Sequence, residues 1–159
     1  MKLLFTAAMI LQARSPFPGR HVLDKAIRIL LVDDHVTVRK ALYALIATAA
    51  DMEVVGAVAD GAAAREQALS LKPDVIILDL STLGGETTSV LASLTNMVPP
   101  ARILVLTDEI DQGEISAAVG TGVKGYLIKG TSAVTILEAV RRLYRGEEVF
   151  DPLVTNFLP

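Results

Sequence analysis

The sequence predicts an α/β fold in which a doubly wound, five-stranded parallel sheet is covered by five helices. The chain has 159 residues, which suits one domain, and 52% of them are hydrophobic, enough to bury a core. From Ile27 onward, short runs rich in β-branched residues alternate with stretches of helical period. The first, third and fourth runs are almost wholly apolar, which is typical of strands covered on both faces.

The predicted strands are short apolar runs bounded by polar or turn residues. They lie at residues 27–32, 52–58, 75–78, 102–106 and 125–128. We interpret the last run, around Tyr126, as an edge of the sheet.

The predicted helices repeat apolar residues at three-to-four spacing. They span residues 36–50, 62–71, 86–97 and 114–119, followed by a last helix that Thr131 or Ser132 caps and Gly146 ends. The last helix carries three arginines, Arg141, Arg142 and Arg145. We expect them to complement the helix C-terminus on a solvated face, and the alternative is a salt-bridged dimer surface.

Polar side chains follow four of the strands at the point where each strand ends. They are Asp33, Asp34, Asp79, Thr107 and Lys129. Each alone has an ordinary structural explanation. The carboxyl ends of parallel strands, however, meet at one sheet edge, where open α/β sheets bind ligands. Three carboxylates there repel one another and need a cation, so we expect a functional site.

The composition excludes several classes of function. The net charge of −3 provides no basic face for DNA, so direct nucleic-acid binding by this chain is disfavoured. The chain has no Cys, which excludes disulfides, thiolate zinc sites and a cysteine nucleophile, and its two His are few for a His-rich metal site. The glycine pattern at 120–125 matches a dinucleotide fingerprint, but it precedes a strand instead of following one, so we interpret it as a tight turn.

Both ends of the chain are expected to lie outside the domain, which we place at residues 27–146. Residues 1–26 contain an apolar run at 3–11 that is much shorter than the roughly 20 residues of a membrane helix. We expect a disordered or cloning-derived extension, and the alternatives are a signal peptide or a partner-binding segment. We expect residues 147–159 to be a C-terminal tail or the start of a linker, too short for a DNA-binding domain.

Four motifs extend over the whole predicted domain. They are residues 29–35 (ILLVDDH), 72–80 (KPDVIILDL), 103–107 (ILVLT) and 122–130 (GVKGYLIKG). With these motifs the chain resembles the receiver domain of two-component response regulators, of the NarL/FixJ type. The resemblance implies a flavodoxin-like fold with strand order 2-1-3-4-5 and a cytoplasmic protein without membrane attachment.

The resemblance also implies phosphoryl chemistry at Asp79. This residue would accept a phosphoryl group from a partner sensor histidine kinase, while Lys129 and Thr107 contact the phosphoryl oxygens. Phosphorylation would draw Thr107 inward, and the ring of Tyr126 would fill the space it leaves, which makes these two residues the switch. The alternative is that Tyr126 is an ordinary aromatic of an edge strand.

The cofactor that the resemblance implies is Mg²⁺. Its ligands would be the carboxylates of Asp34 and Asp79 and the backbone carbonyl of Ser81, and Asp33 would reach it through a water molecule. Oxygen ligands with retained waters are what this ion prefers.

The sequence departs from the family pattern beside the acceptor. Thr82 and Leu83 stand where the family usually has a Met-Pro pair, and Thr87 stands where it has Gly. Asp108 and Glu109 add negative charge after Thr107, so we expect altered entry or retention of the phosphoryl group. Since no acceptor, metal or switch residue is missing, we favour a working receiver.

We therefore expect the regulatory part of a NarL/FixJ-type transcription regulator, which switches a protein-interaction surface and is not a metabolic enzyme. A homodimer is one form that this surface could take. The alternative is a phosphorylation-independent receiver-like domain for dimerisation or adaptor binding, in which Asp79 is merely a buried carboxylate.

Overall fold

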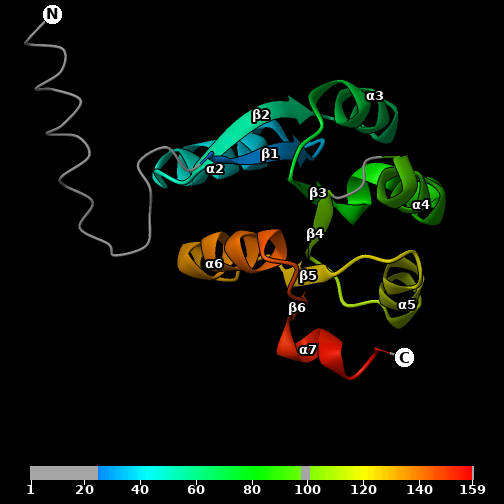
Figure 1. Cartoon of the computed structure of the whole chain (residues 1–159). Coiled ribbons are helices and arrows are strands. Elements are labelled where there is room, and N and C mark those ends of the chain that lie inside the picture. Colours follow the sequence, from blue (N-terminus) through cyan, green and yellow to red (C-terminus); the bar gives the residue numbers. More distant parts are fainter. Residues whose placement is uncertain (1–24, 98–100, 159) are drawn as a thin grey trace, which may run out of the picture.

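The computed structural model describes residues 25–97 and 101–158, which form a parallel sheet between two layers of helices (Figure 1). The strands lie in the order β2-β1-β3-β4-β5-β6, and every neighbouring pair is parallel. Their bounds are β1 Ile27–Val32, β2 Met52–Val58, β3 Val75–Asp79, β4 Arg102–Thr107, β5 Gly125–Ile128 and β6 Val149–Phe150. The predicted fold class and the order 2-1-3-4-5 are confirmed, and a sixth strand extends the sheet.

The helices of the described residues divide between the two faces of the sheet. Their bounds are α2 Val36–Ala47, α3 Gly61–Leu71, α4 Thr87–Met97, α5 Gln112–Gly120, α6 Ala133–Tyr144 and α7 Pro152–Thr155, with a 3-10 helix, η1, at Leu80–Glu86. One buried cluster joins the sheet to α2 and α6, and the other joins it to α3, α4, α5 and α7. Alternate strand residues such as Leu30 and Leu31 belong to opposite clusters, because successive side chains point to opposite faces.

Local signals explain where most helices begin and end. Side chains of Asp60, Asp111 and Ser132 accept hydrogen bonds from the third backbone N–H beyond them, at the N-termini of α3, α5 and α6. Lys72 adopts a left-handed conformation with φ of 48° and ends α3 directly before Pro73. The helix predicted at 36–50 ends earlier, at Ala47, because Thr48 turns to hydrogen-bond the carbonyl of Leu45.

The C-terminal residues differ from the expected tail or linker. Val149 and Phe150 pair with Gly125 and Tyr126 as the sixth strand. Asp151 then caps α7 by accepting a hydrogen bond from the backbone N–H of Leu153 at 2.9 Å. The prediction that Tyr126 lies at an edge is therefore wrong, because β5 is covered by β4 on one side and by β6 on the other.

Candidate functional site

The carboxyl ends of four strands bring the predicted polar residues to one edge of the sheet. Asp33 and Asp34 follow β1, Asp79 ends β3, Thr107 ends β4 and Lys129 follows β5. Among the described residues, the buried polar side chains are those of Asp33, Asp79 and Thr107. These three side chains thus lie together at this edge, where they must be neutralised or hydrogen-bonded.

Lys129 provides the positive charge of the site. Its Nζ donates a hydrogen bond to Asp79 Oδ2 at 2.8 Å and lies 3.5 Å from Asp33 Oδ2 and 3.8 Å from Asp108 Oδ2. Burial by itself lowers the pKa of Lys129, but the hydrogen bond to Asp79 and the charges of the three carboxylates raise it above its usual value. The ammonium group therefore stays charged at neutral pH.

Asp79 is held by the first residues of η1 as well as by Lys129. Its Oδ1 accepts a hydrogen bond from the backbone N–H of Ser81 at 3.2 Å, and its Oδ2 accepts one from Ser81 Oγ at 2.7 Å. The structure thus places Ser81 beside the acceptor carboxylate. The metal-ligand role of the Ser81 carbonyl stays a prediction.

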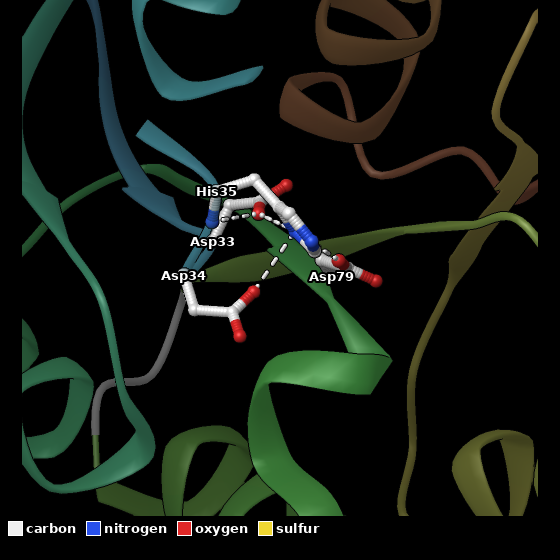
Figure 2. Close-up of side chains that lie close together, drawn as sticks. All are labelled: Asp33, Asp34, His35 and Asp79. Atoms are coloured by element: carbon white, nitrogen blue, oxygen red, sulfur yellow. Dashed lines mark hydrogen bonds and ion pairs between the residues drawn. The ribbon is translucent and has the colours of Figure 1, made fainter. Parts of the chain in front are cut away.

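His35, which was not among the predicted site residues, joins the carboxylates (Figure 2). Its Nδ1 lies 2.9 Å from Asp34 Oδ1, 3.1 Å from Asp33 Oδ1 and 3.9 Å from Asp79 Oδ2. The signal available in the sequence was its position directly after the aspartate pair. That position alone does not reveal that the ring turns back toward β3.

Two further residues fix the aspartate pair. Arg39 donates a hydrogen bond from its guanidinium to the backbone carbonyl of Asp33 at 2.6 Å. Thr82 Oγ1 accepts from the backbone N–H of Asp34 at 3.0 Å and donates to Asp34 Oδ1 at 3.3 Å. Thr82, which departs from the family pattern, is therefore a direct support of Asp34.

The residues at this edge fit a divalent cation. Asp33, Asp34, His35 and Asp79 each offer a ligand atom, and these atoms lie within 4.8 Å of one another. Lys129 pairs with Asp33 and Asp79 while Asp34 lies in the same cluster, so the site has surplus negative charge that a hard cation would neutralise. Asp33, Asp34 and Asp79 are therefore the carboxylates that could hold a divalent cation.

Thr107 faces a small hollow beside the acceptor. The hollow measures about 140 Å³ and is lined by Ser81, Thr107, Asp108, Glu109 and Glu114. Within the described ranges, the hydroxyl of Thr107 makes long contacts of 3.4 Å with the backbone N–H and carbonyl of Glu109. Such weak contacts leave the hydroxyl free to take a better acceptor.

Tyr126 lies inside the core, not on the surface of an edge strand. Its side chain is fully buried in the cluster that contains Ile115 of α5 and Val154 of α7. Its hydroxyl has no hydrogen-bond partner among the described residues. Burial raises the pKa of Tyr126 well above its usual value, and the charges of Glu114 and Asp111 raise it further.

The three arginines of α6 form ion pairs within the chain. Arg141 donates two hydrogen bonds to Asp51, at 2.8 and 3.0 Å, and Arg142 and Arg145 each donate to Glu147 at 2.9 Å. Arg141 and Arg142 lie in the last turn of α6, as expected for cations that complement the helix C-terminus, and all three side chains keep solvent exposure while each pairs with a carboxylate of its own domain. Separately, none of the helices in the described part of the chain is both long enough and apolar enough to cross a membrane.

Comparison with known proteins agrees with this geometry. The family model of the response regulator receiver domain matches residues 29–141. The response regulator protein VraR of Staphylococcus epidermidis is 39% identical over 129 residues, which cover 81% of this chain and 62% of VraR. VraR of Staphylococcus aureus is 39% identical over 128 residues, covering 80% of this chain and 61% of VraR. The chain thus spans about three fifths of the length of these relatives.

Solved structures show the same architecture. A LuxR-family two-component response regulator from Aurantimonas sp. SI85-9A1 matches with a TM-score of 0.76 and 26% identity, covering 83% of this chain and 94% of that structure. The receiver domain of a NarL regulator from Mycobacterium tuberculosis matches with a TM-score of 0.72 and 28% identity, covering 77% and 99%. By its sequence, its fold and the acidic edge of its sheet, the chain belongs to the response regulator receiver domain family of two-component systems.

Proposed function

We propose that Asp79 accepts a phosphoryl group from a sensor histidine kinase and that phosphorylation switches a protein-interaction surface of this domain. The observation that carries the proposal is the hydrogen bond from Lys129 to Asp79 within a cluster of carboxylates. A lysine that is already paired with the acceptor can turn to a phosphoryl oxygen once the acceptor is phosphorylated. The expected localisation is cytoplasmic, where such a kinase would meet its substrate.

Phosphoryl transfer requires the protein mainly to position the reacting groups and to neutralise the charge on the transferring phosphoryl group. A carboxylate oxygen of Asp79 attacks phosphorus, the bond from phosphorus to the donor nitrogen or oxygen breaks, and the donor leaves with that electron pair. Lys129 neutralises charge on the transferring group, and the Thr107 hydroxyl donates to one of its oxygens. Mg²⁺, when held by Asp33, Asp34 and Asp79, would supply the remaining positive charge.

The change in the protein-interaction surface starts from the hydroxyl of Thr107. Thr107 moves toward the phosphoryl group, and the space beside it becomes available to the buried ring of Tyr126 and to the residues of α5 around the hollow. We propose that this changes the surface of α5, β5 and α6 and thereby partner binding or homodimerisation. The chain resembles the VraR response regulators over about three fifths of their length, and we propose that it is the regulatory part of a transcription regulator.

Intact-mass measurement tests the proposal. The full chain is incubated with Mg²⁺ and a small acyl phosphate, and we expect a mass gain of one phosphoryl group. Asp79→Asn should gain nothing, whereas Asp60→Asn, a control at an exposed helix cap, should gain the same mass as wild type. If the wild type gains no mass, the proposal fails, and the domain would act as a phosphorylation-independent dimerisation or adaptor module.

A further inference from the structure

The imidazole ring of His35 lies over the carboxylates that would hold the cation (Figure 2). We propose that His35 supplies a nitrogen ligand to the ion, so that the site binds a divalent transition metal such as Mn²⁺ more tightly than Mg²⁺. This inference rests on the metal site of the proposed function and names the class of ion that the site selects.

The distances around Nδ1 suit a shared ion. Neighbouring ligands of an octahedral ion with bonds of about 2.1 Å lie about 3 Å apart, and opposite ligands lie about 4.2 Å apart. Nδ1 lies 2.9 Å from Asp34 Oδ1 and 3.1 Å from Asp33 Oδ1, close to the first spacing. Its 3.9 Å separation from Asp79 Oδ2 lies between the two spacings. Nδ1 is within hydrogen-bond distance of Asp33 Oδ1, and the same spacings allow it to serve as a fourth ligand beside the three carboxylates.

The backbone orients His35 for this role. It is the N-cap residue of α2, in an extended conformation with φ of −82° and ψ of 109°. Its backbone N–H donates to Asp33 Oδ1 at 2.8 Å, while its ring makes no capping hydrogen bond to the helix. The side chain is 59% exposed, so the ring can adjust to an ion without moving buried atoms.

Ligand chemistry then determines selectivity. Mg²⁺ prefers oxygen ligands and retained waters, and it gains little from an imidazole. Imidazole nitrogen suits first-row transition ions, whose affinity for mixed nitrogen and oxygen sites rises from Mn²⁺ toward Cu²⁺. A site with three carboxylates and His35 should therefore discriminate against Mg²⁺, and a site with the carboxylates alone should not.

Spectroscopy of the Mn²⁺-loaded full chain tests this directly. Three-pulse electron spin echo measurements on the wild type should show modulation by a bound ¹⁴N nucleus, and His35→Ala should lose it. His21→Ala provides the matched control, because His21 is the other histidine of the chain, and it should keep the modulation. Calorimetry should show that His35→Ala weakens Mn²⁺ binding by about tenfold or more while Mg²⁺ binding changes by less than about threefold.

The outcomes separate this inference from the proposed function. Absence of ¹⁴N modulation in the wild type, or absence of Mn²⁺ binding, overturns the inference without the need for any variant. Equal loss of both ions in His35→Ala also overturns it, because His35 would then only position the carboxylates. If the nitrogen signal is present but Asp79 gains no phosphoryl group with either ion, the proposed function fails and the metal selectivity stands.

Discussion

Lys129 Nζ and Asp79 Oδ2 lie 2.8 Å apart, although 50 residues separate them in the chain. The positions of the two residues at the ends of nearby strands create this contact. Asp79 is the last residue of β3 and Lys129 follows β5, and β4 lies between these two strands. The long lysine side chain spans the width of β4, which places one ammonium group against two buried carboxylates.

Loss of this ammonium group should destabilise the domain. Lys129→Met leaves Asp33 and Asp79 buried without their cation, and we expect the free energy of unfolding to fall by about 2 kcal/mol or more. Lys124→Met is the matched control, because Lys124 makes a 2.7 Å ion pair with Glu148 on the exposed surface. It should cost less than about 1 kcal/mol. Urea denaturation of metal-free protein at neutral pH measures both, and equal losses would contradict the prediction.

Removal of the Tyr126 hydroxyl should stabilise the domain. This hydroxyl is buried without a partner among the described residues, so Tyr126→Phe removes a polar group that folding desolvates without replacement. We expect the free energy of unfolding at neutral pH to rise by about 1 kcal/mol. Tyr144→Phe, at an exposed tyrosine, should change it by less than about 0.5 kcal/mol. Destabilisation by Tyr126→Phe in a denaturation experiment would indicate a hydrogen bond to this hydroxyl.

Alkaline pH should enlarge the advantage of Tyr126→Phe. The folded protein raises the pKa of Tyr126 above the ordinary value of 10.0. Above pH 10.0 the tyrosine of the unfolded chain therefore ionises first, and the wild-type protein loses stability as the pH rises further. The difference in unfolding free energy between Tyr126→Phe and wild type should therefore grow by up to about 1.4 kcal/mol per pH unit above that value. Denaturation curves from about pH 9 to about pH 11 measure it. A constant difference would mean that the phenol ionises equally in both states.

The C-terminal segment should contribute to the stability of the core. Val154 of α7 is fully buried in the cluster that contains Tyr126, whereas the adjacent Leu153 is 57% exposed. We expect Val154→Ala to lower the free energy of unfolding by about 2 kcal/mol and Leu153→Ala to leave it nearly unchanged. Thermal or urea denaturation of the two variants provides the measurement. If neither changes stability, the C-terminal residues behave as the tail or start of a linker that the sequence suggested.

Gly125 should not tolerate a side chain. A Cβ atom there would lie 2.7 Å from Leu143 Cδ1 of α6 and 3.1 Å from the backbone carbonyl oxygen of Ile103. Gly125→Ala should therefore lower the free energy of unfolding by about 1 to 3 kcal/mol. Gly120→Ala, at the end of α5 with nothing within 4 Å of the added atom, should be neutral or stabilising by up to about 1 kcal/mol. Similar effects of the two substitutions on denaturation midpoints would contradict this packing.

The elements with strong periodicity were predictable. The strands β1, β2 and β5 have the predicted bounds, because each is a run of apolar or β-branched residues between clear breaks. The start of α5 was placed two residues late, since Asp111 caps it through the backbone N–H of Glu114 and the weak apolar pattern hid that signal. The strand β6 has only two residues and no period of its own, so pairing with β5 defines it.

The chain itself determined which residues end the strands, and therefore that Asp33, Asp34, Asp79, Thr107 and Lys129 would meet at one edge of a parallel sheet. That outcome needs only hydrophobic patterning and the shared direction of the strands. Tertiary structure alone decided that His35 turns into the carboxylates, that Thr82 holds Asp34 and that Tyr126 is covered by β6 and α7. Those contacts depend on rotamers and on packing between residues far apart in the chain, for which a one-dimensional pattern carries no signal.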